Sequence, residues 1–199
     1  MTARISFISH AATTAVRRAA FPSDESLHDR EIASIKALGW SAPRAQHILA
    51  APERRTQETT HALGLSHSID SALRDCNYGT WQGRALSDVQ ENDSDGLAIW
   101  LTDLTAAPHQ GESMATLMHR AERWLCSREA QGHTIAVTHP SFIRSAIVYA
   151  LGAPVEAFWR IDIAPLSLTD LRFNGRAWTL RCASCSLNQS AGNQSAGLE

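Results

Sequence analysis

The segment TIAVTHPSFIRSAIVYALG, residues 134–152, predicts a buried strand that leads directly into a helix. Residues 134–138 form a short apolar run that is typical of a strand in the middle of a sheet. The run ends at His139-Pro140, and an apolar helix then continues through Leu151, where Gly152 closes it. A strand followed at once by a helix is typical of layered α/β folds.

The rest of the chain alternates between strand-like and helix-like stretches. Further strands are predicted at residues 5–8, 48–51, 66–69, 158–163, 166–173 and 176–182. Helices are predicted at residues 27–38, 53–63 and 113–129, with one or two short helices in an insertion at 84–108. We therefore expect a single α/β domain over residues 1–185, built as three layers with a mostly parallel central sheet flanked by helices.

The C-terminal residues have a different composition. The sequence NQSAG occurs at residues 188–192 and again at 193–197. Such a polar, repetitive stretch lacks the apolar residues that a packed core needs. Residues 186–199 are therefore predicted to form a flexible low-complexity tail.

Composition limits the possible functions. The chain has 199 residues, enough for one domain, and its 18 basic and 20 acidic residues give a formal net charge of −2. This balance provides no broad positive field for nucleic acid or an anionic membrane. The sequence shows neither a secretion signal nor a membrane-spanning apolar run, so we expect a cytoplasmic protein, either a monomer or a homodimer. Cys182 and Cys185 form a CxxC pair that lacks the second ligand pair of a structural zinc site. Coincidental spacing is the favoured interpretation, with metal or redox use as the alternative. We expect no metal or cofactor.

Two histidines stand at the ends of predicted strands. His10 follows the strand at residues 5–8, and His139 follows the strand at residues 134–138. The carboxyl ends of parallel strands are where ligands bind, and helix N-termini at the same edge favour anions. One such histidine would usually be an ordinary loop residue, but two in matching positions favour a shared site.

Two further segments carry charged candidates. Arg54 and Arg55 begin a predicted helix, where positive charge opposes the helix dipole, and a bound anion would explain that placement. Either arginine could instead face solvent. Asp75 lies in the loop LRDCNYGTWQG, residues 73–83, whose aromatic residues and glycines predict a tight, shaped loop. The Asp75 carboxylate could serve chemistry or could only shape a turn.

Five motifs together resemble the histidine phosphatase superfamily, also called phosphoglycerate mutase-like. The family signatures are Arg-His-Gly after the first strand, Ser-Pro-x-x-Arg-Ala-x-Gln-Thr, an acidic Leu-x-Glu loop, a Gly-Glu-Ser helix start, and Thr-His after an apolar strand. In this sequence the matching stretches are Ser9-His10-Ala11 and residues 51–59, 73–83, 111–113 and 137–141. The matches keep the family order and extend over about residues 3–150.

The resemblance implies a metal-independent phosphatase that hydrolyses phosphomonoesters. His10 would attack phosphorus and form a phosphohistidine. Asp75, one methylene shorter than the family's usual glutamate, would be protonated beforehand and would donate a proton to the leaving alkoxide. Arg55 and His139 would stabilise the charge on the phosphoryl oxygens. The implied partner is a small phosphorylated substrate.

The main departure from the family is Ser9, which stands where the first arginine is expected. Removing one preorganised donor of this kind typically costs about 2.7–4 kcal/mol. Arg17 or Arg18 could replace the missing arginine, or the pocket could accept a less charged group. A third possibility is a weak or inactive relative that binds phosphate and has a regulatory role. We expect Ser9, Thr13 and Arg17 to complete the phosphate-binding set with Arg55.

Mutase members of the family usually have longer chains with extra C-terminal and insertion segments, so the resemblance leads us to expect a hydrolase for this compact chain. The insertion at residues 84–108 and the loop after His10 are expected to line the substrate pocket. That loop contains Phe21, Pro22, Asp24 and Glu25. Its mixed aromatic and acidic character predicts a substrate whose organic part is neutral or cationic.

A metallohydrolase is a chemical alternative. In that reading His10, Asp75 and His139 would be metal ligands, because two imidazoles and a carboxylate match a known type of metal triad. The guanidinium of Arg55 near the same pocket would repel a cation, which disfavours this reading.

Overall fold

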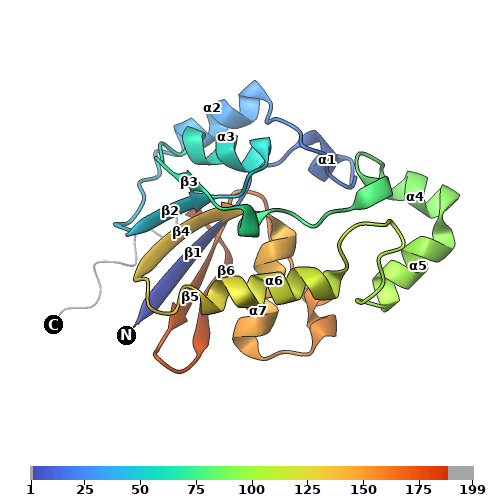
Figure 1. The fold of residues 1–199 in the computed structure, drawn as a ribbon. Coiled ribbons are helices and arrows are strands. Elements are labelled where there is room, and N and C mark those ends of the chain that lie inside the picture. Colours follow the sequence, from blue (N-terminus) through green and yellow to red (C-terminus); the bar gives the residue numbers. More distant parts are fainter. Residues whose placement is uncertain (1, 188–199) are drawn as a thin grey trace.

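The computed structural model describes residues 2–187, which contain a six-stranded sheet in the order β3-β2-β4-β1-β5-β6 (Figure 1). The first four strands in this order pair in parallel, and β5 pairs antiparallel with both β1 and β6. The strands are β1 (Ala3–Ser9), β2 (His47–Ala50), β3 (Ser68–Ile69), β4 (His133–Thr138), β5 (Ser167–Phe173) and β6 (Trp178–Ser186). The predicted α/β class with a mostly parallel central sheet is therefore confirmed.

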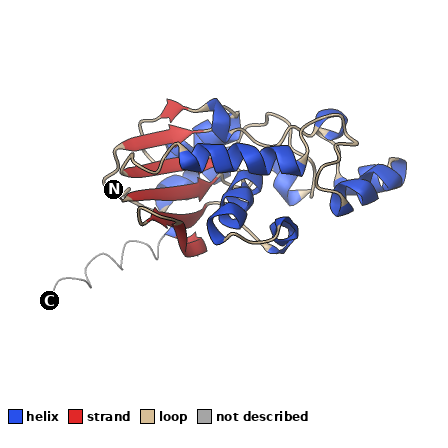
Figure 2. Cartoon of the chain, turned by 60° about the horizontal axis from the view of Figure 1, so that its bottom comes forward, coloured by secondary structure: helices blue, strands red, loops and turns tan. Residues whose placement is uncertain are grey.

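Helices cover both faces of the sheet, as Figures 1 and 2 show. The helices α2 (Asp29–Ala37) and α3 (Arg54–Ala62) lie on one face, and α6 (Met114–Cys126) and α7 (Pro140–Leu151) lie on the other. The helices α4 (Leu86–Asn92) and α5 (Ser94–Thr102) project beyond the end of the sheet where the parallel strands finish. The remaining short elements are α1 (Thr14–Arg17) and the 3-10 turns η1 (Ser71–Leu73), η2 (Gly79–Trp81) and η3 (Val155–Arg160).

The central strands are apolar throughout because both of their faces are buried. In β1, Phe7 packs with the hydrophobic cluster under α6 and α7, whereas its neighbour Ile8 packs with the cluster under α2 and α3. The same alternation separates Ala136 from Ile135 and Val137 in β4. Successive side chains of a strand point to opposite faces, so one short apolar run supplies both cores.

The register of β1 and β4 sets the position of the candidate site. Ser9 pairs with Thr138 at the last step of this parallel ladder, so the chain leaves the sheet at His10 and His139 side by side. The backbone N–H of His10 donates to the carbonyl of Thr138 at 3.0 Å, which holds the carboxyl ends of β1 and β4 together.

Two details of the predicted elements are wrong. The apolar stretch at 158–163 was expected to be a strand, but residues 158–160 lie in η3 and residues 161–163 belong to no strand. Phe158 is buried in the core from this 3-10 turn. The boundary at residue 185 is also too early, because β6 runs to Ser186 and Leu187 is buried at 2% exposure. The rest of the predicted tail, residues 188–199, lies outside the described residues.

Candidate active site

Four of the predicted site residues converge at the carboxyl ends of β1, β2 and β4. The ring centroids of His10 and His139 lie 5.3 Å apart, and both side chains are buried. Arg55 reaches the same point from the first turn of α3, and Asp75 reaches it from the loop between η1 and η2. The guanidinium Nη2 of Arg55 donates to Asp75 Oδ2 at 2.8 Å. Residues that are distant in the chain therefore form one contiguous polar cluster.

The ring of His10 is held with one nitrogen free. Its Nδ1 lies 2.8 Å from the carbonyl oxygen of Ala11, and because a carbonyl can only accept, Nδ1 carries the hydrogen. The lone pair is therefore on Nε2. Burial is the main cause that lowers the pKa of His10, and the nearby charges of His139 and Arg55 lower it further, to about 3. At neutral pH the ring is an uncharged imidazole, the form in which nitrogen can act as a nucleophile.

Arg55 is the buried member of the arginine pair at the start of α3. Its side chain is 2% exposed, and its Nη1 donates to the carbonyl of Ser23 at 2.8 Å. Arg54 is exposed, and its backbone N–H donates to Asp24 Oδ1 at 2.8 Å. The negative charge that the helix N-terminus favours is thus supplied by Asp24, while Arg55 is free to point inward.

Asp75 is strongly engaged by donors. Its Oδ1 accepts from the Ser141 hydroxyl at 2.5 Å and from the backbone N–H of Cys76 at 2.8 Å. Burial acts to raise the pKa of Asp75, but the charges of His139 and Arg55 and the Ser141 hydrogen bond outweigh it and hold the pKa well below its usual range. The carboxyl is therefore ionised in this arrangement, contrary to the expectation that it is protonated beforehand.

A second carboxylate, Glu53, lies in the site and was not predicted from the sequence. Its Oε2 lies 2.8 Å from His139 Nε2, and its Oε1 accepts from the backbone N–H of Asp75 at 2.9 Å. Glu53 stands at the N-cap position of α3, two residues before Arg55 in the same motif, and this spacing was the available signal. Two carboxylates thus oppose the two groups that can carry positive charge here, Arg55 and His139.

The other predicted phosphate ligands have different surroundings. Ser9 is fully buried, and its hydroxyl has no hydrogen-bond partner. The hydroxyl of Thr13 accepts from the backbone N–H of Val16 and caps α1. Arg17 pairs with Glu31 on α2. In this structure the Arg17 side chain points toward α2, so its role as a phosphate ligand stays a prediction.

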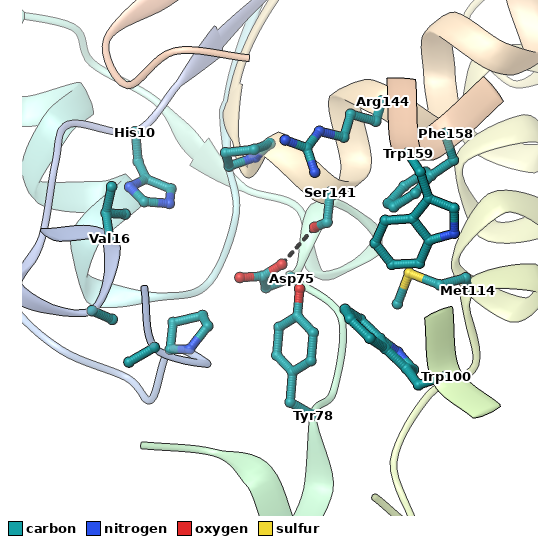
Figure 3. Close-up of a pocket in the computed structure, with 14 residues that line it drawn as sticks. His10, Val16, Asp75, Tyr78, Trp100, Met114, Ser141, Arg144, Phe158 and Trp159 are labelled. Atoms are coloured by element: carbon teal, nitrogen blue, oxygen red, sulfur yellow. Dashed lines mark hydrogen bonds between the residues drawn. The ribbon is translucent and has the colours of Figure 1, made fainter. Parts of the chain in front are cut away.

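A cavity of about 160 Å³ opens beside His10 and Asp75 (Figure 3). Most of its wall is apolar or aromatic, and one basic side chain, Arg144, lines it among the described residues. Burial and the charge of Asp75 raise the pKa of Tyr78 well above its usual value, so its phenol stays protonated. The aromatic lining residues are Tyr78, Trp100, Phe158 and Trp159.

The expected substrate loop contributes less to this cavity than predicted. Only Pro22 of the four named loop residues lines the cavity, whereas Phe21 packs against Trp81 with ring centroids 5.2 Å apart. Asp24 is used at the start of α3, and Glu25 accepts from the backbone N–H of Ala15. Neither acidic residue of this loop therefore lines the cavity. The insertion does contribute, through Trp100.

The described part of the chain also bears on two expectations. None of its helices combines the length and apolar character needed to cross a membrane. Among the described residues, no group of three or more histidine, cysteine or acidic side chains has an arrangement that could hold a metal ion. Arg55 contacts both Asp75 and His139, so the proposed metal triad would place a cation beside a guanidinium.

Comparison with known proteins gives the family. The chain matches the model of the histidine phosphatase superfamily (branch 1) over residues 5–186, and it belongs to this superfamily. It is 27% identical over 153 residues to a bifunctional protein of Mycobacterium tuberculosis, which covers 70% of this chain and 41% of that protein. It is 27% identical over 139 residues to glucosyl-3-phosphoglycerate phosphatase of Mycobacterium tuberculosis, which covers 62% of this chain and 61% of that enzyme. The chain therefore spans less than two thirds of the length of these relatives.

Solved structures share the fold. A mycobacterial glucosyl-3-phosphoglycerate phosphatase in complex with VO3 superposes with a TM-score of 0.78 at 22% identity, covering 92% of this chain and 100% of that one. The alpha-ribazole phosphatase from Shigella flexneri superposes with a TM-score of 0.79 at 22% identity, covering 91% and 96%. Several of these proteins are named as phosphatases, in agreement with the class predicted from the motifs.

Proposed function

We propose that this chain hydrolyses a small phosphomonoester through a phosphohistidine formed on His10. The observation that carries the proposal is the state of the His10 ring, which is neutral and has Nε2 free beside His139 and Arg55. The relatives support phosphate chemistry, since glucosyl-3-phosphoglycerate phosphatase and adenosylcobalamin/alpha-ribazole phosphatase are among them. Both are named as phosphatases.

The reaction would proceed in two transfers. Nε2 of His10 attacks phosphorus, the bond to the leaving oxygen breaks, and that oxygen takes a proton from Asp75. Arg55 and His139 stabilise the non-bridging oxygens in place of a metal. Water then attacks the phosphohistidine, returns a proton to Asp75, and releases inorganic phosphate with His10 restored.

Asp75 must acquire a proton before it can act as an acid. An incoming phosphoryl group would compete with Asp75 for Arg55 and would place like charge beside the carboxylate. Like charge raises a carboxyl pKa, so the substrate and the proton are taken up together. This coupling assigns a role to the ion pair between Arg55 and Asp75, whose Nη2 and Oδ2 atoms lie 2.8 Å apart.

A weakly active or inactive phosphate-binding relative remains the competing proposal, and two observations favour it. Ser9 supplies no cation, and losing one preorganised donor typically costs roughly 100–1,000-fold in rate. Glu53 and Asp75 also oppose the charges of His139 and Arg55, so an incoming phosphate must displace contacts at 2.8 Å. Both features predict slow turnover and weak binding.

Hydrolysis of para-nitrophenyl phosphate tests the proposal. We expect steady turnover that is retained in EDTA, and loss of at least about 1,000-fold in His10→Ala, because a missing nucleophile cannot be replaced by binding alone. His119→Ala is the matched control, since His119 is exposed on α6 and outside the cavity. A labelled phosphate donor should give an acid-labile, alkali-stable label that His10→Ala lacks.

Each other outcome selects a different reading. Phosphate binding without turnover in the intact protein would establish the phosphate-binding relative. Turnover that EDTA abolishes would establish the metallohydrolase. Turnover that His10→Ala retains would reject the covalent route.

A further inference from the structure

Arg144 lines the cavity but is not part of the polar cluster formed by His10, Arg55, Asp75 and His139. It lies on α7, one turn beyond Ser141, and Figure 3 shows its guanidinium among the residues that surround the cavity. Its side chain is 27% exposed, so the group is accessible without being free in bulk solvent. Arg144 was not among the residues predicted from the sequence.

The guanidinium of Arg144 is poorly satisfied by the protein. Its Nε is buried and has no hydrogen-bond partner. Its one carboxylate contact is Asp162, 3.7 Å from Nη2, and the Asp162 side chain is 96% exposed. An ion pair that is long and open to solvent contributes little. Its Cζ also lies 5.8 Å from the ring centroid of Phe158, a contact that leaves the edge of the guanidinium available.

Arg120, by contrast, is an arginine whose guanidinium donors are largely bonded within the protein. Its Nε and Nη2 donate to the Glu112 carboxylate at 3.0 and 2.6 Å, and its Nη1 donates to the carbonyls of Ala72 and Arg74 at 2.8 Å. Arg144 makes no comparable set of bonds among the described residues. A guanidinium has five N–H donors in a fixed planar arrangement, and two of them can bind both oxygens of one carboxylate. The Arg144 donors that have no protein partner could therefore bind the carboxylate of a ligand.

The residues around Arg144 indicate what kind of organic group such an acidic ligand would carry. Phe158, Trp159 and Trp100 form an apolar wall next to the guanidinium, with the Trp100 and Trp159 ring centroids 4.8 Å apart. His10 and Asp75 line the same cavity, so one compact molecule can reach them and Arg144 together. An aromatic wall favours a flat apolar body, and a cation with unfilled donors favours an acid on that body.

We propose that Arg144 binds a second acidic group, carried by the organic part of the substrate, so that the chain prefers phosphomonoesters of compact apolar or aromatic hydroxy acids. This inference rests on the proposed function. It replaces the expectation of a neutral or cationic organic part. Without substrate, the Asp162 carboxylate lies 3.7 Å from Nη2 of Arg144. A substrate carboxylate bound in the less exposed cavity would replace this ion pair.

Matched substrates test the inference. Phenyl phosphate and 3-carboxyphenyl phosphate share an aromatic ring and a phenolic leaving oxygen and differ in one carboxylate. We expect the protein to favour the carboxylated substrate. In Arg144→Gln, kcat/KM for that substrate should fall about 10- to 100-fold, mainly through KM, because a charge-assisted hydrogen bond is lost. The value for phenyl phosphate should change less than about threefold, since no Arg144 contact with the phosphoryl group is involved.

Two further variants separate binding from folding. Arg160→Gln removes a neighbouring exposed arginine that does not line the cavity and should preserve the preference. Arg144→Lys keeps the charge but loses the fork and should retain part of the preference. Equal losses on both substrates in Arg144→Gln would overturn the inference, since they would place Arg144 on the phosphoryl group itself. Absence of any preference in the wild type would also overturn it.

A binding experiment keeps this inference separate from the proposed function. Phenylphosphonate and 3-carboxyphenylphosphonate cannot be hydrolysed at the carbon–phosphorus bond, so their affinities report recognition alone. Calorimetry with His10→Ala should show tighter binding of the carboxylated phosphonate, and Arg144→Gln should reduce the difference by about 10-fold or more. If phosphomonoesters are not turned over but this difference persists, the proposed function fails and the acid-binding role of Arg144 stands. Equal affinities would overturn that role even in an active enzyme.

Discussion

The surroundings of His10 and Asp75 lower both pKa values, which leaves one side chain neutral and the other ionised. Burial is the main cause that lowers the pKa of His10, to about 3, so its ring is uncharged at neutral pH. For Asp75 burial acts in the other direction, and the charges of His139 and Arg55 outweigh it. The nucleophile is therefore ready at neutral pH, whereas the acid depends on what enters the cavity.

The role of Asp75 can be tested by varying the leaving group. Asp75→Asn keeps the shape but cannot donate a proton to the leaving oxygen. We expect kcat/KM to fall about 100-fold or more for an alkyl phosphate, whose alkoxide leaves poorly, and less than about 10-fold for para-nitrophenyl phosphate. Steady-state kinetics on both substrates measures the contrast. Equal losses would show that Asp75 only orients Arg55.

The neutral state of His10 has a consequence for stability. Between pH 6.5 and 3 the unfolded chain binds a proton at this residue and the folded protein does not, so unfolding becomes easier as pH falls through that range. The expected loss from this residue between pH 7 and pH 5 is about 2 kcal/mol. Denaturant unfolding at both pH values should show that His10→Asn has a shallower pH dependence than the wild type. Parallel pH profiles would contradict a buried neutral histidine.

At the level of residues, sequence reasoning found the members of the site that fixed motifs identify. His10, Asp75 and His139 each follow or interrupt a recognisable segment, and Arg55 occupies a defined place in one. Glu53 and Arg144 escaped because their significance depends on where the side chains point after folding. The position of Arg17 could not be predicted for the same reason, since only the direction of α1 decides whether that guanidinium faces the cavity or Glu31.

At the level of elements, α6 holds the loop that carries Asp75. Arg120 on this helix donates to the carbonyls of Ala72 and Arg74, and its Nη2 also donates to the carbonyl of Asp75 at 3.1 Å. Glu112, just before α6, supplies the opposing charge, with its side chain and that of Arg120 both 6% exposed. The buried pair thus fixes the position of the acid through the backbone.

Breaking that pair should affect both stability and catalysis. In Arg120→Met the Glu112 carboxylate loses its buried partner and keeps only the longer contact with the partly exposed Arg74, 3.6 Å from Nη2. Breaking a buried pair typically costs about 3–5 kcal/mol. We expect a loss of that size in chemical unfolding, together with lower kcat. Arg123→Met is the control, because Arg123 is exposed on the same helix. A Glu112→Leu change added to Arg120→Met should recover part of the stability, since no unpaired charge remains.

The strongly patterned elements were predictable and the ambiguous ones were not. The strand and helix around His139 begin and end within about one residue of the prediction, because Pro140 and Gly152 mark the helix ends. The stretch at 158–163 has the same apolar character as a strand. Its actual path depends on the burial of Phe158 against the core and the contact of Trp159 with Trp100, which no local pattern contains.

At the level of the whole molecule, the sheet order brings together residues that are up to about 130 positions apart. Parallel pairing of β1 and β2 with β4 places their carboxyl ends at one edge, and α4 and α5 lie beyond that edge (Figure 1). This alternation of strands and helices made the layered fold predictable. The length of β6 was not, because the burial of Leu187 depends on packing against the sheet rather than on local polarity.

A phosphate analogue should stabilise the assembled site as a unit. Orthovanadate can form a bond to a neutral imidazole nitrogen, and a ligand at 100 times its Kd adds about 2.7 kcal/mol to the stability of the folded state. For a domain of this size we expect the melting temperature to rise by about 5–10 °C. His10→Ala should lose most of the increase, whereas His119→Ala should keep it. A shift that does not depend on His10 would mean that the anion binds elsewhere.

The contact between His10 Nδ1 and the carbonyl of Ala11, at 2.8 Å, also determines which chemical product can accumulate on the enzyme. Imidazole can carry a phosphoryl group on either nitrogen, giving two positional isomers. Here the nitrogen nearer the main chain is occupied, so the modified protein should contain only the 3-phosphohistidine isomer. Phosphorus NMR or isomer-selective antibodies can distinguish the two isomers. Detection of 1-phosphohistidine would mean that the imidazole ring rotates and exposes Nδ1 before it reacts.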